Sequence, residues 1–415
     1  MDALNGLRLL LCFTLAKTTY SQSTTDDNYK LIWEENFDSP TKTGAVDRTK
    51  WEHETTAWGG GNCEFQVYTP DTTNTYVKDG TLFIKPTLTV NNTNPLTNQP
   101  FGKDFLTTGD LDLNAMYGAC TMSDNWGCRR EGKYGLIPPI MSGRIRTKGR
   151  FAFKYGRLEV VAKMPVGDWM WPAIWLLPEG NIYGGWPRSG EIDLVETRGN
   201  RDLKYTESGN YAGIQDIGST LHWGPVWNVN HYHLTTGHHE NVTSNYGDHF
   251  HTYLLDWDEF GLRFYIDGHE IAKYPDPLIN DDPDWTGWWD FGAPWENNET
   301  NPWADESKMT PFDQKFHIVM NVAVGSTNGF MPDASAATNG GAAKPYNNSD
   351  PDAIVKFWNA RDEWYPTWTA EGDNAAMQVK SLKVYQHQIQ TCNVSVGTSV
   401  RITVMLWAVL LLNFV

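Results

Sequence analysis

Residues 251–274 read HTYLLDWDEFGLRFYIDGHEIAKY, and this stretch decides the fold class. Its short apolar runs are separated by turn residues, as in strands that are joined by tight turns. The pair Asp267-Gly268 is a strong signal for a hairpin, because both residues tolerate the positive φ angles of a two-residue turn. The stretch therefore predicts consecutive antiparallel strands.

Two further stretches have the same character. GRLEVVAKMP, residues 156–165, alternates apolar and polar side chains with the period of a strand that has one solvated face. NAAMQVKSLKVYQ, residues 374–386, is typical of a closing strand. Many short strands at turn-separated intervals predict an all-β antiparallel sandwich. No internal repeat and no linker divides the chain, so we expect one folded domain over residues 28–390.

Three polar stretches rich in Gly and Pro interrupt this pattern, at residues 87–140, 199–248 and 276–310. We expect long loops there, which in compact domains are usually functional or disordered. The chain of 415 residues is 40% hydrophobic and contains 20 tryptophans, enough for one large core. Its formal charge of -17 argues against a nucleic-acid partner, since a phosphate backbone requires a positive surface. An acidic surface suits a neutral substrate.

Both ends of the chain have the character of processing signals. The apolar run LRLLLCFTLA, followed by the polar TTYSQS, predicts a secretory signal peptide over residues 1–22, with a buried first element as the alternative. The apolar end VRITVMLWAVLLLNFV, within residues 391–415, is shorter than a bilayer span of about 17 to 25 residues. It is either a glycolipid-anchor signal that is removed or a plain hydrophobic tail. We expect a secreted protein, attached to a membrane only if the tail is an anchor signal.

Cysteine usage supports an extracellular protein. After signal cleavage four cysteines remain, which predicts two disulfides with three alternative pairings: Cys63, Cys120, Cys128 and Cys392. We expect Cys120 to pair with Cys128, closing a short loop. The sequence contains no CxxC motif and no His/Cys cluster that would indicate a zinc site. Five glycosylation sequons agree with the secretory pathway: Asn91, Asn241, Asn298, Asn347 and Asn393.

The stretch SGEIDLVETRG, residues 189–199, places Glu191, Asp193 and Glu196 in an otherwise apolar strand. Acidic residues occupy 50 of 415 positions, so this spacing should arise about 0.7 times by chance. A solvated strand face is the alternative, but no Lys or Arg is interleaved to relieve the repulsion. Because side chains alternate along a strand, Glu196 should point away from the other two. All three share a face only if a β-bulge follows Asp193, and bulges are frequent beside active sites.

Paired carboxylates have a well-defined use on sugars. Retaining glycosidases attack the anomeric carbon with one carboxylate and protonate the leaving oxygen with the other. Trp169, Trp171 and Trp186 lie near the carboxylates in the sequence, and flat aromatic faces stack on pyranose rings. Trp175, between two aliphatic residues, is expected in the core. His222 in TLHWG is either a polar contact or a structural histidine.

Five stretches together resemble a known family: GGGNCEFQVYT, RIRTKGRFAFKYGRLEVVAKMP, GDWMWPAIWLLP, WPRSGEIDLVETRGN and LHWG. They are similar, in the same order, to glycoside hydrolase family sixteen, and specifically to its laminarinase type, which includes the invertebrate β-1,3-glucan recognition proteins. The resemblance covers about residues 30 to 388. It implies a concanavalin-like β-jelly roll, a sandwich of two curved antiparallel sheets with a cleft across the concave sheet.

The resemblance also implies roles for individual residues. Glu191 matches the nucleophile, Asp193 its hydrogen-bonding helper and Glu196 the acid/base of a retaining mechanism. Two residues between Asp193 and Glu196, as in laminarinases, indicate β-1,3-glucan as the substrate. Trp171, Trp186 and His222 match positions in the family's sugar-binding cleft, and Asn62 resembles a cleft-edge residue, with a turn residue as the alternative. Arg144 matches a position near the cleft, with pairing to a carboxylate as the alternative. Trp169, beside Gly167 and Asp168, is expected to bind sugar on the basis of its neighbours, with core packing as the alternative. No cofactor is implied as a requirement, although some members bind a structural calcium ion.

We therefore expect a monomeric, endo-acting β-1,3-glucanase that hydrolyses laminarin-like glucans with retention of configuration. The main alternative is a β-1,3-glucan recognition protein that binds without hydrolysis. Recognition proteins of this family have usually lost at least one of the acidic residues, whereas this chain retains all three. A mixed-linkage glucanase or a transglycosylase is a closer alternative, because water and sugar hydroxyls compete for one intermediate.

Overall fold

The computed structural model describes residues 29–38, 44–274, 286–293, 295, 299–337 and 341–388. The predicted signal peptide, residues 1–22, and the tail, residues 391–415, lie outside these described residues. The chain divides into a large compact unit, Ile32–Val384, and a small one formed by Met1–Leu31 and Tyr385–Val415. In the small unit the rings of Tyr29 and His387 are 4.2 Å apart. The site described below lies entirely in the large unit.

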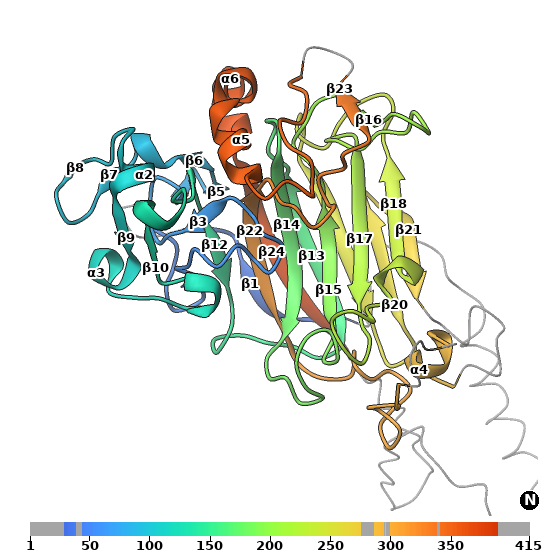
Figure 1. Ribbon diagram of the computed structural model, residues 1–415. Helices are drawn as coiled ribbons and strands as arrows, with labels where there is room; N and C mark the ends of the chain where they lie inside the picture. Colours follow the sequence, from blue (N-terminus) through green and yellow to red (C-terminus); the bar gives the residue numbers. More distant parts are fainter. Residues whose placement is uncertain are drawn as a thin grey trace, which may run out of the picture. The chain divides into compact units, whose positions relative to one another are not determined.

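One sheet contains eight strands: β1 Tyr29–Glu35, β4 Thr75–Lys78, β5 Thr81–Ile84, β13 Gly156–Lys163, β19 His251–Trp257, β20 Leu262–Ile266, β21 His269–Tyr274 and β24 Met377–His387. Seven of them follow the order β21-β20-β19-β13-β24-β5-β4 (Figure 1). All three stretches that predicted strands lie in this sheet. Ile266 pairs with His269 around Asp267 and Gly268, whose φ angles are 50° and 82°, so the predicted hairpin is confirmed.

The second sheet contains seven strands: β2 Glu52–His53, β12 Arg144–Arg146, β14 Met170–Pro178, β15 Glu191–Glu196, β17 Asp216–His222, β18 Thr236–Glu240 and β22 Phe316–Val324. Their order is β18-β17-β15-β14-β22-β12-β2 (Figure 1). Every neighbouring pair in this order is antiparallel. The carboxylate-rich stretch is thus the third strand from one edge.

Short elements surround the two large sheets. The small strands are β3 Gln66–Tyr68, β6 Thr87–Leu88, β7 Thr93–Asn94, β8 Gln99–Pro100, β9 Asp110–Asp112, β10 Arg129–Glu131, β11 Ile140–Ser142, β16 Leu203–Tyr205 and β23 Ser335–Ala337. The α-helices are α2 Phe105–Thr108, α3 Leu113–Tyr117, α4 Trp288–Phe291, α5 Ala353–Asn359 and α6 Arg361–Glu371. The 3-10 helices are η1 Thr89–Asn91, η2 Asp124–Trp126, η3 Gly132–Tyr134, η4 Tyr232–Leu234 and η6 Gly372–Ala375. None of the helices in the described residues is long and apolar enough to cross a bilayer.

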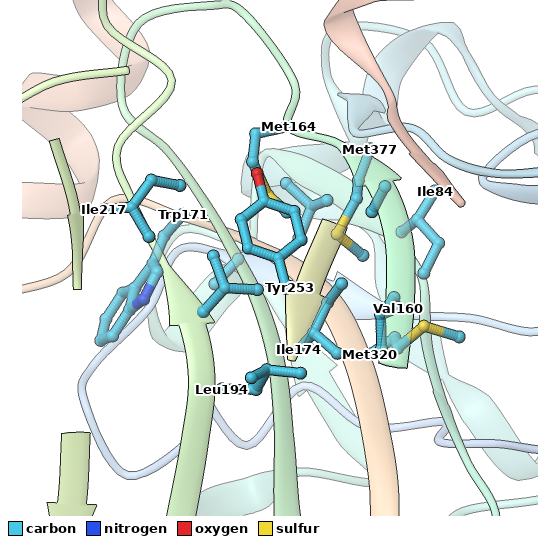
Figure 2. Packing of buried hydrophobic residues seen from close by; sticks show 14 of the residues in the cluster. Ile84, Val160, Met164, Trp171, Ile174, Leu194, Ile217, Tyr253, Met320 and Met377 are labelled. Carbon is cyan, nitrogen blue, oxygen red and sulfur yellow. The ribbon is translucent and has the colours of Figure 1, made fainter. Parts of the chain in front are cut away.

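The core lies between the two large sheets. In β13 buried and partly exposed residues alternate strictly, as the sequence predicted. Figure 2 shows Val160 of β13 and Tyr253 of β19 together with Ile174 of β14 and Leu194 of β15, so both sheets contribute to one cluster. Each aliphatic side chain buried in this way contributes about 1.5 to 3 kcal/mol. The predicted all-β jelly-roll sandwich is confirmed.

Two of the predicted long loops contain β-strands, and the third, residues 276–310, contains the short helix α4. Residues 199–248 include β17 and β18, both strands of the second sheet. They lack a clear sequence signal, because β17 is buried on both faces and β18 is a mostly polar edge strand. Residues 87–140 contribute to a separate hydrophobic cluster: Ala57, Val67, Leu106, Leu111, Leu113, Met116, Ile137 and Met141. The predicted disulfide Cys120–Cys128 is present there, with a Cα–Cα distance of 5.5 Å.

Helices α5 and α6 were not predicted. Their sequence has no regular apolar stripe, and Pro366 lies inside α6. Tertiary contacts hold them instead: Trp364 and Trp368 are buried, and Trp368 Nε1 donates a hydrogen bond to the backbone oxygen of Asp168 at 2.9 Å.

Candidate active site

A β-bulge turns the three carboxylates of β15 onto one face of the seven-stranded sheet. Opposite them on β17, Glu191, Asp193 and Glu196 pair with His222, Thr220 and Gly218 respectively. The step from Asp193 to Glu196 therefore covers three residues on β15 but two on β17, with a register shift between them. Residues directly opposite each other share a face, so all three carboxylates share one. The predicted bulge is confirmed, and we call this face the carboxylate face.

The neighbours of Glu196 are small. Ala173 of β14 pairs with it on one side, and Gly218 of β17 pairs with it on the other. Trp175 pairs with Asp193, so its side chain also belongs to the carboxylate face, where it is half-buried. The expectation that Trp175 lies in the core was wrong, because alternation sends it to the face opposite Ile174 and Leu176.

Two indole N–H groups hold the glutamates. Trp171 Nε1 donates to Glu196 Oε1 at 2.8 Å, and Trp186 Nε1 donates to Glu191 Oε2 at 3.0 Å. Trp171 lies on β14, close to Ala173, the residue that pairs with Glu196, whereas Trp186 lies in the loop before β15. A hydrogen bond from a neutral donor to a carboxylate stabilises the charged form and fixes the orientation of the group.

His222 lies beside the other two members of the group. Its Nε2 is 3.3 Å from Asp193 Oδ2 and 3.9 Å from Glu191 Oε1. The rings of Trp186 and Tyr232 flank the imidazole, with centroids 5.6 and 5.4 Å away. His222 therefore lies near the carboxylates, but its nearest partner is Asn230, whose Nδ2 lies 2.7 Å from Nδ1 of His222. Whether it also contacts a sugar stays a prediction.

Burial raises the pKa of each carboxyl in the group. For Glu191 the pKa is about 8, because burial and the neighbouring Asp193 both disfavour the charge, while the charge of Arg144 opposes the shift. For Glu196 the pKa is also about 8, because burial and Asp193 raise it, while the hydrogen bond from the Trp171 N–H opposes the shift. Burial raises the pKa of Asp193 well above its usual range. Near neutral pH the group therefore holds protons that isolated carboxylates would have lost.

Arg144 of β12 is a buried cation near the carboxylate group. The residue is buried, and its Nε lies 3.2 Å from Glu54 Oε2. Its guanidinium also lies 4.5 Å from the ring centroid of Trp175. The ion pair with Glu54 confirms the alternative that Arg144 pairs with a carboxylate, and a sugar contact by its other nitrogens stays a prediction. The positive charge of Arg144 also acts on the site, because it lowers the pKa of Glu191.

Trp171 is at the site but does not present an open ring. Phe330 stacks on it with centroids 3.8 Å apart and an interplanar angle of 5°, which leaves Trp171 7% exposed. The guanidinium of Arg198 lies 4.2 Å from the ring centroid of Phe330. The expected stacking of sugar on Trp171 was therefore wrong for the covered face. Trp169 is fully buried, so a sugar contact there was wrong as well, because its ring belongs to the core.

Asn62 belongs to a polar network next to this stack. Its Nδ2 donates to Glu64 Oε1 at 3.0 Å, and its Oδ1 accepts a bond from Asn328 Nδ2 at 2.9 Å. These bonds connect the glycine-rich segment 59–61 to the loop that carries Phe330. Asn62 is half-buried, and its contact with a sugar stays a prediction.

Sequence reasoning missed two exposed aromatic residues in the segment after β17: Tyr232, whose ring lies beside His222, and Trp227. Trp186, which was predicted, is 44% exposed, and Tyr232 and Trp227 are 48% and 74% exposed. Large exposed apolar side chains that gather beside a polar site mark binding surfaces. The signal was present in the stretch GPVWNVNHYH, but no periodicity reveals which aromatic residues of a hairpin face a neighbouring strand.

One group of side chains has the spacing of metal ligands in the described part of the chain. It consists of Glu191, Asp193 and His222, whose ligand atoms lie within 4.8 Å of one another. Calcium prefers about six to eight oxygen ligands, so two carboxylates with an imidazole do not fit it. We assign no residues to the structural calcium implied by the resemblance.

The family model described as glycosyl hydrolases family 16 matches residues 120–284. A β-1,3-glucan-binding protein of Penaeus monodon is 45% identical over 388 residues, which cover 91% of this chain and 96% of that protein. The chain belongs to glycosyl hydrolase family 16. The predicted membership, including the relation to invertebrate glucan-binding proteins, is confirmed.

Two further comparisons place this family 16 chain beside enzymes. Glucan endo-1,3-beta-glucosidase A1 of Niallia circulans is 32% identical over 320 residues, which cover 74% of this chain but 35% of that protein. The laminarinase structure from Rhodothermus marinus has a TM-score of 0.50 and 23% identity, covering 87% of this chain and 98% of that one. The structural likeness shows the shared fold.

Proposed function

We propose that this family 16 protein is an extracellular endo-β-1,3-glucanase that cleaves laminarin-like glucans by a retaining double displacement. One observation carries the proposal: Glu191, Asp193 and Glu196 are all present and share the carboxylate face through the bulge. The 32% identity to an enzyme named as a glucan endo-1,3-beta-glucosidase supports the reaction class.

The proposed reaction has two steps. Glu191 attacks the anomeric carbon and the bond to the leaving oxygen breaks, while Glu196 delivers its proton to that oxygen. A water molecule then gives its proton to Glu196 and attacks the same carbon, which releases Glu191 and restores both groups. The raised pKa of Glu196 suits a proton donor near neutral pH. The N–H of Trp186 and the charge of Arg144 favour the ionised form that Glu191 needs as a nucleophile.

A second candidate function is glucan recognition without hydrolysis. It is favoured by the 45% identity to a protein named as a β-1,3-glucan-binding protein. The intact carboxylates argue against it, because a sensor needs no group of three acids with raised pKa values, and burying such a group is costly.

The test is reducing-sugar release from laminarin by the purified full chain. We expect release by the wild type and background levels for Glu191→Gln and Glu196→Gln, with Glu159→Gln on β13 of the other sheet as the matched control. An active Glu191→Gln variant would sink the mechanism. Wild-type binding to insoluble β-1,3-glucan with no soluble product would favour the recognition function.

The extracellular location is part of the proposal. It is supported by the Cys120–Cys128 disulfide, which oxidising compartments favour. Two of the sequons, Asn91 and Asn347, are exposed and accessible to glycosylation. Mass spectrometry of the mature protein would test the signal cleavage, the fate of the tail and the glycans together.

A further inference from the structure

His222 is held between the carboxylates and a second polar side chain. One ring nitrogen, Nε2, faces Asp193 Oδ2 at 3.3 Å, and the other, Nδ1, lies 2.7 Å from Asn230 Nδ2. Asn230 follows the hairpin that begins after β17. Because the two nitrogens of imidazole have different roles, the group bound at Nδ1 decides what Nε2 can do.

The orientation of the Asn230 amide follows from its other contact. The backbone N–H of Trp223 donates to Asn230 Oδ1 at 3.3 Å. The oxygen is therefore occupied by a donor, and the amide nitrogen is the atom that faces His222. An amide NH₂ can only donate, so Nδ1 of His222 must be the acceptor. The ring proton is then on Nε2, the nitrogen that faces the carboxylates.

Both alternative arrangements lose a hydrogen bond. If His222 held two protons, its Nδ1–H would meet the Asn230 NH₂ group, donor against donor. If the amide rotated to accept that proton, its NH₂ would meet the backbone N–H of Trp223 instead. The hairpin keeps Asn230 in place: Val226 bridges Val229, and His231 N donates to the Trp223 oxygen at 2.9 Å.

The turn itself tolerates no side chain where it is tightest. Gly224 has a φ of +148°, and a Cβ there would lie 1.9 Å from the oxygen of Val229. Glycine permits this close approach of the two arms of the hairpin. The position of Asn230 against His222 is therefore set by the backbone.

The oxygen that faces Nε2 of His222, Asp193 Oδ2, is a hydrogen-bond acceptor that needs a donor. Asp193 Oδ2 is buried, and among the described residues no hydrogen bond reaches it. Nε2 of His222 lies 3.3 Å from this oxygen, but the two groups do not have hydrogen-bond geometry without a bound substrate. Contacts of this kind are often long without substrate and tighten in the complex.

We propose that Asn230 is a positioning residue that keeps His222 neutral, with its proton on Nε2, so that His222 donates to Asp193 and never accepts a proton from it. Any proton on Asp193 then resides on Oδ1, and the imidazole adds no positive charge to the group. The groups that face His222 are Glu191, Asp193 and Glu196 of β15 and Tyr232 of η4, with Arg144 of β12 behind Glu191.

The protonation state can be measured without any enzyme assay. We would label the histidines of the full chain with ¹⁵N and record the NMR signals of the ring nitrogens at pH 7, using His222→Gln to assign them. We expect an unprotonated Nδ1 and a protonated Nε2 for His222. A carboxylate in Asn230→Asp would accept from Trp223 and from Nδ1–H together, so we expect a doubly protonated ring in that variant. Asn228→Asp, at an exposed position of the same hairpin, adds the same charge without touching His222 and should leave the signal unchanged.

The catalytic role rests on the proposed function, whereas the protonation state rests on geometry alone. In laminarin hydrolysis we expect Asn230→Asp to lower kcat by at least about tenfold with little change in KM; a wrong histidine tautomer costs about 10⁴-fold in serine proteases. A wild-type His222 that is protonated on Nδ1, or a signal that Asn230→Asp does not move, would overturn the proposal even in an active enzyme. A wild type that is inactive but shows the expected tautomer would overturn hydrolysis and leave the positioning role intact.

Discussion

The two indole N–H groups provide a test of which glutamate has which role. Trp171→Phe removes the 2.8 Å bond to Glu196 Oε1 and retains a ring to stack on Phe330. A hydrogen bond to a charged group is worth about 1.5 to 3 kcal/mol, and one pKa unit corresponds to about 1.4 kcal/mol. The N–H stabilises the ionised form of Glu196, so its loss should raise the pKa of that carboxyl by about 1 to 2 units.

The consequence appears in the pH dependence of kcat/KM for laminarin. An acid/base must be protonated to deliver its proton, so the alkaline limb of the profile should move to higher pH in Trp171→Phe. Trp186→Phe removes the 3.0 Å bond to Glu191 Oε2 in the same way. Because a nucleophile must be ionised, that substitution should move the acid limb to higher pH instead. The second shift should be smaller, since Trp186 is partly exposed and water replaces its N–H.

The limbs report the titration of the coupled carboxyl group, so the comparison between the two variants is the decisive measurement. If Trp171→Phe moved the acid limb and Trp186→Phe the alkaline limb, the roles of Glu191 and Glu196 would be reversed. If neither limb moved, the indole N–H groups would not control the charges of the site, and the reasoning from geometry to pKa would be refuted.

Two further predictions concern residues around the site. Burial raises the pKa of Asp168 from 3.8 to about 6. Between pH 4 and 6 the folded chain therefore binds more protons at this residue than the unfolded chain does. The contribution of Asp168 to stability falls as pH rises through that window. Asp168→Asn keeps an acceptor for the Ala342 N–H and should raise the free energy of unfolding by up to about 3 kcal/mol above pH 6, measured in urea, with no gain at pH 3; equal gains at both pH values would contradict this. Phe330→Ala should release Trp171 and lower kcat by up to about 10²-fold, because a small misplacement of a catalytic group is costly, while Phe330→Leu should recover part of the activity. Unchanged kcat in Phe330→Ala would show that the stack does not position Glu196.

Local patterns predicted most of the sheet that lies away from the site. In β13 and in the β19–β20–β21 meander, apolar side chains alternate and a strong turn pair marks the hairpin, so short-range sequence is sufficient. The same reasoning failed for β17 and β18, whose burial depends on neighbours and does not alternate clearly. It also failed for α5 and α6, which are held by the tryptophans that they bury.

The candidate site divides in the same way. Glu191, Asp193 and Glu196 were predicted with their bulge, because parity along a strand is a local property. Trp169 was assigned to sugar binding wrongly, because neighbours that are distant in sequence decide whether a ring is covered. Phe330 and Asn230 were missed for the same reason, since neither belongs to a motif.

The sequence by itself determined three carboxylates on one strand, the need for a bulge between Asp193 and Glu196, and membership of family 16. Only the tertiary structure decided which side chains set the charges of that strand. Trp171, His222 and Phe330 come from β14, β17 and the loop after β22, and strand pairing between distant segments brings them to the carboxylates. Hydrogen bonds and burial act over a few ångströms in space, whatever the separation along the chain, so the protonation of the site is a property of the folded sheet.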